Sequence, residues 1–115
     1  MEAEFSLTSE VKDGCLVIVT DGYVNNQGGE QIADEFEKHF ENGIKKVIIN
    51  LAKSKVVNSI GISFLIEIIE KLNDVDGKMV FTNLDPSIEK TLTIMGLFNF
   101  AEKAATVEDA IKALN

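Results

Sequence analysis

Few residues of this chain have side chains suited to catalysis or metal binding. Among 115 residues there is one cysteine, Cys15, and one histidine, His39. A single cysteine cannot close an internal disulfide, and the pair cannot supply a zinc ligand set. His39 has no serine or cysteine with an orienting acid in any recognised motif, which leaves a catalytic triad without support. We therefore expect no enzyme activity, no catalytic residue, no metal and no cofactor, and we expect Cys15 to be inert in a core strand.

Two short segments have compositions found in ligand-binding loops. The run Asn73-Asp74-Val75-Asp76-Gly77 is similar to a calcium loop, but the oxygen spacing and the downstream bidentate glutamate do not follow, so it predicts a turn. Gly28-Gly29 could cradle a phosphate before a helix. Neither a G-x-G-x-x-G pattern nor a Lys-Ser pair accompanies it. The two glycines are therefore predicted to make a long polar loop flexible.

The charge pattern excludes other classes of partner. The net charge is −8, and all 11 basic residues are lysines. An acidic chain repels phosphate backbones, and the absence of arginine removes the side chain best suited to bidentate phosphate contacts, so we expect no nucleic acid partner. The N-terminus lacks the features of a secretory signal, and the longest apolar stretch, 60–72, is interrupted by Glu67, Glu70 and Lys71. We expect a cytoplasmic protein without membrane insertion.

Predicted strands and helices alternate along the chain. Alternation or β-branched apolar runs predict strands at 5–7, 15–20, 47–51 and 79–82, with Asp13-Gly14 as a hairpin turn. Apolar spacing and caps predict helices at about 30–42 and 59–72, one beginning at Asp85-Pro86 and ending near Gly96, and a final one capped by Thr106. A short extended piece is predicted at 98–100. This order predicts one α/β domain, 1–115, with a mixed, mostly parallel sheet of four to five strands packed against about four helices.

The segment 47–62, VIINLAKSKVVNSIGI, resembles the signature of the STAS family, the fold of bacterial anti-sigma-factor antagonists. There, a strand ending in Asp-Leu-Ser is followed by an apolar pair and by Asp-Ser-Ser-Gly-Leu at a helix start. Weaker similarities follow in order over nearly the whole chain, at 22–25, 77–81, 95–98 and 108–111. The resemblance implies a STAS-like fold and a non-enzymatic signalling module. It also implies partner switching in transcription regulation, with an anti-sigma factor or serine kinase-like protein as the partner.

The departures from the family pattern affect its switch. The second serine of the family's Asp-Ser-Ser-Gly is the residue that the partner kinase phosphorylates, and here that position is Ile60. The first serine is retained as Ser59. Three aspartates of the pattern are replaced by Asn25, Asn50 and Asn58. The resemblance therefore implies a domain that is not switched by phosphorylation at residue 60.

Ser59 has two interpretations. In the preferred one, Asn58 or Ser59 caps the helix by accepting a hydrogen bond from a free backbone N–H. In the alternative, Ser59 replaces Ile60 as phosphoacceptor, because a helix N-terminus favours a phosphate group of about −2 charge. A shift of one residue rotates the side chain by about 100°, which turns the hydroxyl away from the direction that the family uses.

The helix at 59–72 predicts one core face and one exposed apolar patch. At about 100° per residue, the core face contains Ile62, Leu65, Ile66, Ile69 and Leu72, with Ile68 at its boundary. Ile60 and Phe64 lie outside that face. They either form an exposed patch or are covered by a neighbouring loop at 23–28, and both interpretations stay open. Exposed apolar patches rimmed by charge often mark protein contacts.

The predicted partner-binding site joins this patch to the residues that carry the resemblance: Asn25, Asn58, Ser59, Ile60, Gly61 and Phe64. Two alternatives from other classes stay open. The chain could be a structural or regulatory subunit of a larger sensory or transporter assembly, since STAS-like domains also occur there. It could also sense a small ligand or nucleotide in a groove between the Asn25 loop and the helix start at Ser59.

Overall fold

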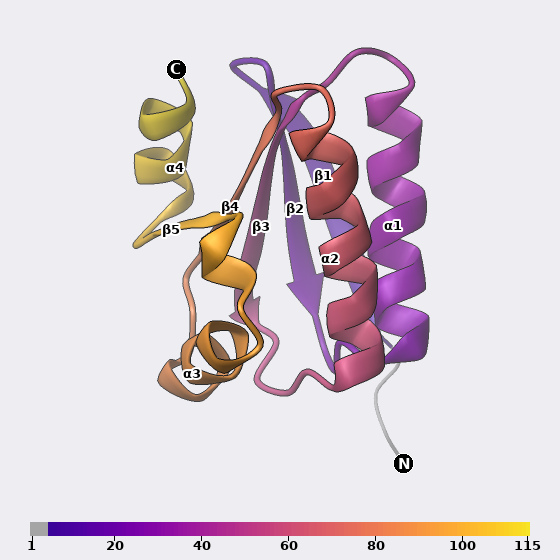
Figure 1. Cartoon of the computed structure of the whole chain (residues 1–115), viewed down its shortest axis with the longest axis vertical. Helices are drawn as coiled ribbons and strands as arrows, with labels where there is room; N and C mark the ends of the chain where they lie inside the picture. Colours follow the sequence, from indigo (N-terminus) through magenta and orange to yellow (C-terminus); the bar gives the residue numbers. More distant parts are fainter. Residues whose placement is uncertain (1–4) are drawn as a thin grey trace.

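The sheet has five strands arranged in their order along the chain (Figure 1). In this computed structural model, which describes residues 5–115, β1 (Ser6–Lys12) pairs antiparallel with β2 (Cys15–Asp21). Parallel pairing then continues through β3 (Lys46–Lys53), β4 (Lys78–Thr82) and β5 (Glu102–Ala104). The mostly parallel sheet is confirmed. The first four residues of the predicted domain lie outside the described residues.

Each of the strands β2 to β5 is followed by a helix, and the first three of these helices are crossover connections between parallel strands. They are α1 (Asn26–Phe40), α2 (Ser59–Asn73), α3 (Pro86–Ile94) and α4 (Val107–Leu114), with a 3₁₀ turn η1 (Leu97–Asn99) after α3. The predicted caps of α3 and α4 are confirmed: Asp85 accepts a hydrogen bond from the Ser87 N–H at 3.0 Å, and Thr106 accepts one from the Asp109 N–H at 3.1 Å. The β1–β2 turn has positive φ at Asp13 and Gly14, as a two-residue hairpin requires.

The two faces of the sheet are covered unequally (Figure 1). Alternate strand residues, such as Ile18, Ile49 and Phe81, join the larger core with α1, α2 and α3, because side chains alternate across a strand. The intervening residues, including Val17, Ile48 and Val80, form a smaller cluster with Ala110 and Ile111 of α4. Cys15 belongs to this second cluster. Its burial raises the pKa of the thiol, which disfavours the nucleophilic thiolate.

Two predicted boundaries are wrong. The segment 22–29 was expected to be a loop, with a helix from about 30 to 42, but α1 begins at Asn26 and ends at Phe40. Gly28 and Gly29 are therefore buried helix residues, and the prediction that they provide flexibility is wrong. Glycine has a low helix propensity, which explains the late predicted start. Packing against neighbouring segments overrides that preference.

The predicted extended piece at 98–100 is also wrong. Leu97–Asn99 forms the 3₁₀ turn instead, and the short strand comes later, at Glu102–Ala104. The turn directs Phe98 towards the core, where its ring meets Phe81 edge to face with centroids 6.0 Å apart. Within the described residues, no helix has both the length and the apolar composition that a membrane crossing requires.

Candidate partner-binding site

The helices α1 and α2 begin side by side at one end of the sheet (Figure 1). The segments before them are joined by a parallel bridge between Val24 and Val57. The Val24 N–H donates to the Val56 carbonyl at 3.0 Å, and the Asn58 N–H donates to the Val24 carbonyl at 3.1 Å. These bonds join the Asn25 loop directly to the segment before α2. The two helix starts therefore form one continuous surface.

Asparagine caps both helices. The Asn58 side chain accepts a hydrogen bond from the Gly61 N–H at 2.8 Å, and the Asn25 side chain accepts one from the Gly28 N–H at 3.1 Å. Of the two candidates for the α2 cap, the structure selects Asn58, which leaves Ser59 as the first helical residue with an exposed side chain. Asn50 has a local role too, because its side chain accepts from the Ala52 N–H at 2.9 Å.

Gly61 lets α2 approach the neighbouring segment. A Cβ atom at this position would lie 2.1 Å from the Val24 carbonyl oxygen, far inside van der Waals contact. The same carbonyl accepts the Asn58 N–H, so it cannot move without breaking that bond. Gly61 is buried and therefore shapes the surface without being presented on it.

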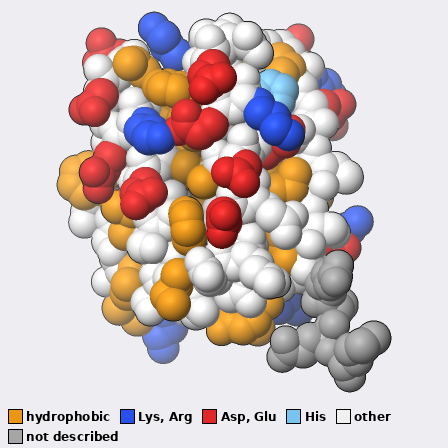
Figure 2. Space-filling view, turned by 90° about the vertical axis from the view of Figure 1, so that its right-hand side faces the viewer, with side chains coloured by type: hydrophobic (Ala, Val, Ile, Leu, Met, Phe, Trp, Pro, Cys, Tyr) orange, Lys and Arg blue, Asp and Glu red, His pale blue; other side chains and the backbone are white. Residues whose placement is uncertain are grey.

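Three exposed apolar side chains surround the start of α2. Ile60 and Val56 are each 52% exposed, and Tyr23 is 39% exposed. We call these three residues the apolar end. Figure 2 shows hydrophobic side chains near the lower end of the molecule and acidic side chains above them. Tyr23 and Val56 were not among the residues predicted from sequence. The extended pair Val56-Val57 carried a signal for Val56, because side chains alternate along extended backbone and only Val57 faces the core.

Ile60 and Phe64 have different environments. Ile60 is exposed, whereas Phe64 is half-buried and packs against α1, where a Cβ atom at Gly29 would lie 2.6 Å from the Phe64 ring. The cover over Phe64 comes from a helix rather than from the 23–28 loop. The exposed patch therefore contains Ile60, with Phe64 beneath it as a support.

The core face of α2 differs from the predicted one at its edges. Ile68 is 2% exposed, although it was placed at the boundary, whereas Ile66 is only half-buried. The cause is α1, which packs along the Ile68 side of α2 and pairs its Glu37 with Lys71. The other predicted core positions are buried: Ile62, Leu65, Ile69 and Leu72.

Ser9, Glu35 and His39 lie together, but not in the order of a catalytic triad. The Ser9 hydroxyl donates to the Glu35 carboxylate, and His39 Nε2 lies 3.3 Å from the same carboxylate oxygen. The acid thus stands between the hydroxyl and the imidazole, so the imidazole cannot take the serine proton directly. The hydrogen bond from Ser9, with further ones from Lys38 and His39, lowers the pKa of Glu35. Across residues 5–115, no group of three or more His, Cys, Asp or Glu residues could hold a metal ion.

Comparison with known proteins agrees with this fold. The model of the STAS domain family matches residues 6–110. The chain is 26% identical to BtrV of Bordetella bronchiseptica, named as an anti-sigma factor antagonist, over 93% of this chain and 92% of that protein.

Solved structures of anti-sigma factor antagonists share the arrangement. One from Thermotoga maritima has a TM-score of 0.86 at 13% identity, covering 94% of this chain and 93% of that one. The phosphorylated form of SpoIIAA from Bacillus has a TM-score of 0.73 at 24% identity, covering 97% and 100%. The family match spans most of the chain, and the sheet and helices follow it: the chain belongs to the STAS domain family.

Proposed function

We propose that this chain is a non-enzymatic signalling module that binds an anti-sigma factor or serine kinase-like protein through the start of α2. The observation that carries the proposal is the exposure of Ile60, a large apolar side chain with 52% of its surface open to water. Neither the cap of α2 nor its core face requires an apolar residue there. Apolar side chains displayed at such a position favour contact with another protein.

Within this site, the proposed residues divide into two roles. Asn25, Asn58 and Gly61 shape the surface, since the asparagines cap the helices and the glycine admits the Val24 carbonyl. Ile60 and Ser59 are presented at the exposed first turn of α2. Phe64 supports that turn from below by packing on Gly29. Val56 and Tyr23 extend the contact surface beyond the residues proposed from sequence.

Residue 60 has no hydroxyl, and this affects how partner binding can be regulated. Relatives named as anti-sigma factor antagonists include one whose structure is described in a phosphorylated form. Ile60 cannot accept a phosphate, so partner binding here is independent of phosphorylation at that residue. Ser59 is the neighbouring hydroxyl, but it follows the cap directly and points about 100° away.

The first test measures binding to each anti-sigma kinase of the source organism, purified and titrated separately. Ile60→Asp should weaken binding to the recognised kinase by at least about tenfold, because it places a charge in a desolvated contact. The matched control is Val11→Asp. Val11 is 49% exposed, but it precedes the β1–β2 turn, at the opposite end of β2 from the apolar end. Equal effects of the two variants, or no effect of Ile60→Asp, would contradict the proposal.

The second test restores the hydroxyl. Incubated with the same kinase and ATP, Ile60→Ser should incorporate phosphate at residue 60, whereas the natural chain should incorporate none. Intact-protein mass spectrometry followed by peptide mapping gives the site. Stoichiometric phosphate on Ser59 of the natural chain would show that the switch has moved by one residue. If the chain instead associates with a transporter ATPase or a scaffold and with no kinase, the assembly-subunit alternative replaces the proposal.

A further inference from the structure

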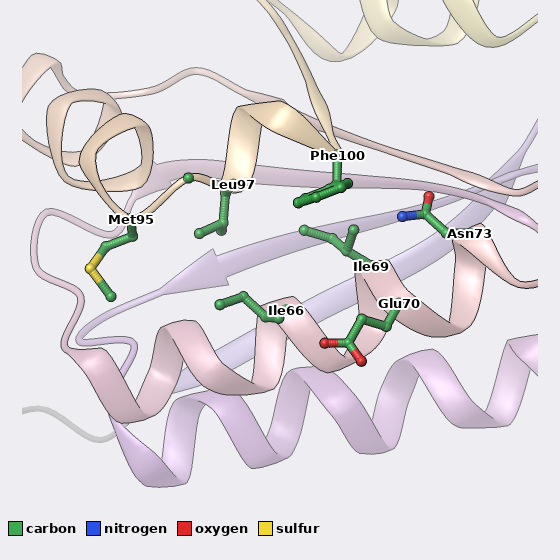
Figure 3. Close-up of a pocket in the computed structure, with 8 residues that line it drawn as sticks. Ile66, Ile69, Glu70, Asn73, Met95, Leu97 and Phe100 are labelled. Carbon is green, nitrogen blue, oxygen red and sulfur yellow. The ribbon is translucent and has the colours of Figure 1, made fainter.

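A second apolar surface lies on the other flank of α2. A groove of about 240 Å³ separates α2 from the turn that follows α3. We call it the α2 groove, and its principal lining residues are Ile66, Ile69, Glu70, Met95, Leu97 and Phe100. Figure 3 shows the apolar side chains from the two sides of the groove pointing towards one another. The groove begins at Ile66, six residues beyond Ile60, and it is distinct from the apolar end.

The exposure of these side chains is unusual for a packed domain. Of the lining residues, Phe100 is 68% exposed and Met95 is 44% exposed. A different aromatic residue, Phe98, packs this turn against the core, where its ring meets Phe81. The Lys103 amine lies over the Phe98 ring, 5.3 Å from the ring centroid. Phe100 is therefore free of the core. Contiguous exposed apolar side chains of this kind mark an interaction surface.

The charge around the groove is acidic. Glu70 is part of the lining, Glu67 is an exposed residue of the same helix, and the exposed Asp74 is its C-cap. In the part of the chain that the structure describes, none of these three carboxylates has a lysine within ion-pair distance. Lys71, the nearby cation on α2, pairs with Glu37 of α1 instead. The groove thus combines an apolar floor with uncompensated negative charge along one edge.

We infer that the α2 groove binds an amphipathic helix of a partner protein, whose apolar face enters the groove and whose lysine or arginine side chains meet Glu70, Glu67 and Asp74. Charge complementarity selects this occupant. A second copy of the chain would bring another net charge of −8 against the same edge. The lined part of α2, from Ile66 to Asn73, is about 10 Å long, which suits two turns of a helix with anchors at i, i+3 and i+7. This surface goes beyond the proposed contact at Ile60.

The test uses a fluorescent synthetic peptide of leucine and lysine, about 14 residues long and patterned to form one apolar helical face. Anisotropy titrations compare it with a peptide of the same composition in scrambled order. Both Phe100→Ser and Glu70→Lys should weaken binding of the patterned peptide by at least about tenfold. Ile60→Ser is the matched control for an exposed apolar side chain on α2 and should leave the affinity unchanged. Circular dichroism checks that every variant folds.

Several outcomes would overturn the inference. Equal binding of the scrambled peptide would show general charge attraction. An unchanged affinity for Phe100→Ser, or equal losses for Phe100→Ser and Ile60→Ser, would remove the groove as the site. Dimerisation in sedimentation velocity that Phe100→Ser abolishes would identify a second copy as the occupant. None of these measurements uses the kinase, so a failure of the proposed function at Ile60 is recorded separately.

Discussion

The two helices that lie beside each other in this molecule begin with the same local pattern. Asn25-Asn26-Gln27-Gly28 opens α1, and Asn58-Ser59-Ile60-Gly61 opens α2. In each case the asparagine caps the helix by accepting from the glycine N–H three residues later. In each case the glycine faces a backbone carbonyl, that of Tyr23 or of Val24. These shared features are what the fold needs in order to start two helices side by side.

The third residue of each pattern differs. Gln27 and Ile60 occupy the same helical position and are both exposed, but only one of them is apolar. Since the start of α1 has a polar residue at this position, the fold does not require the apolar side chain of Ile60. The structure thus accounts for the asparagines and glycines but not for the isoleucine, which is the residue proposed for partner contact. Three predictions concern how the two helices are stabilised in the fold, and they follow in decreasing order of their effect on stability.

The glycines should differ in how much they tolerate a methyl group. Gly61→Ala should lower the free energy of unfolding by about 3 kcal/mol, because the new Cβ would lie 2.1 Å from the Val24 oxygen. Gly28→Ala should lower it by only about 1–2 kcal/mol, since its nearest backbone atom is 2.8 Å away and the Phe5 ring can shift. Urea denaturation measures both, with Ser63→Ala on the exposed face of α2 as control. A smaller effect at Gly61 than at Gly28 would break the comparison.

The two caps should be equivalent. Asn25→Ala and Asn58→Ala each remove one cap bond, and each should lower the free energy of unfolding by about 1 kcal/mol. Asn58→Asp keeps the acceptor and adds a favourable interaction with the helix dipole, so stability should stay within roughly 0.5 kcal/mol. Thermal denaturation at matched salt measures all three. If Asn58→Ala leaves stability unchanged but abolishes kinase binding, Asn58 is a recognition residue and the equivalence fails.

The last prediction concerns the hydrogen bond between Ser9 of β1 and Glu35 of α1. The charged Glu35 carboxylate accepts from Ser9 and the pKa of Glu35 is lowered, so this stabilisation is present above the ordinary pKa and is lost as the pH falls through the lowered one. Ser9→Ala should lower the free energy of unfolding by roughly 0.5 kcal/mol at pH 7. The difference from the natural chain should shrink as the pH falls through the lowered pKa of Glu35, because protonation removes the charge that strengthens this hydrogen bond. Urea denaturation at a series of decreasing pH values measures this, and a constant difference would refute the assignment.

The alternating order of strands and helices could be predicted because it depends on local patterns. The β-branched run before Asp21, the Asp13-Gly14 turn and the Asp85-Pro86 helix start each carry their own signal. The start of α1 could not be predicted, since Gly28 and Gly29 are helical only because Phe5, Tyr23 and Phe64 pack against them. Local propensity opposes that conformation, and only the assembled fold supplies the reason for it.

The candidate site was predictable in part for the same reason. Helical periodicity places Ile60 off the core face, but the sequence left open whether the 23–28 loop covers it, and the structure shows it exposed. The half-burial of Phe64 and the outward position of Ile66 depend on where α1 packs along α2, which no pattern within α2 encodes. Phe98 and Phe100 are two residues apart and similar in sequence context, yet one joins the core and the other does not. Only tertiary contacts distinguish them.

The unequal covering of the sheet has a consequence for how readily this protein aggregates in solution. One helix of eight residues, α4, shields the face that carries Val17, Ile48 and Val80. Short helices detach at a lower free energy than the whole domain unfolds, so the amides of α4 should exchange with deuterium before those of α1 and α2. Each brief departure of α4 uncovers a row of β-branched side chains that suits intermolecular strand stacking. Aggregation should therefore increase when α4 is destabilised, although α4 takes no part in either proposed contact.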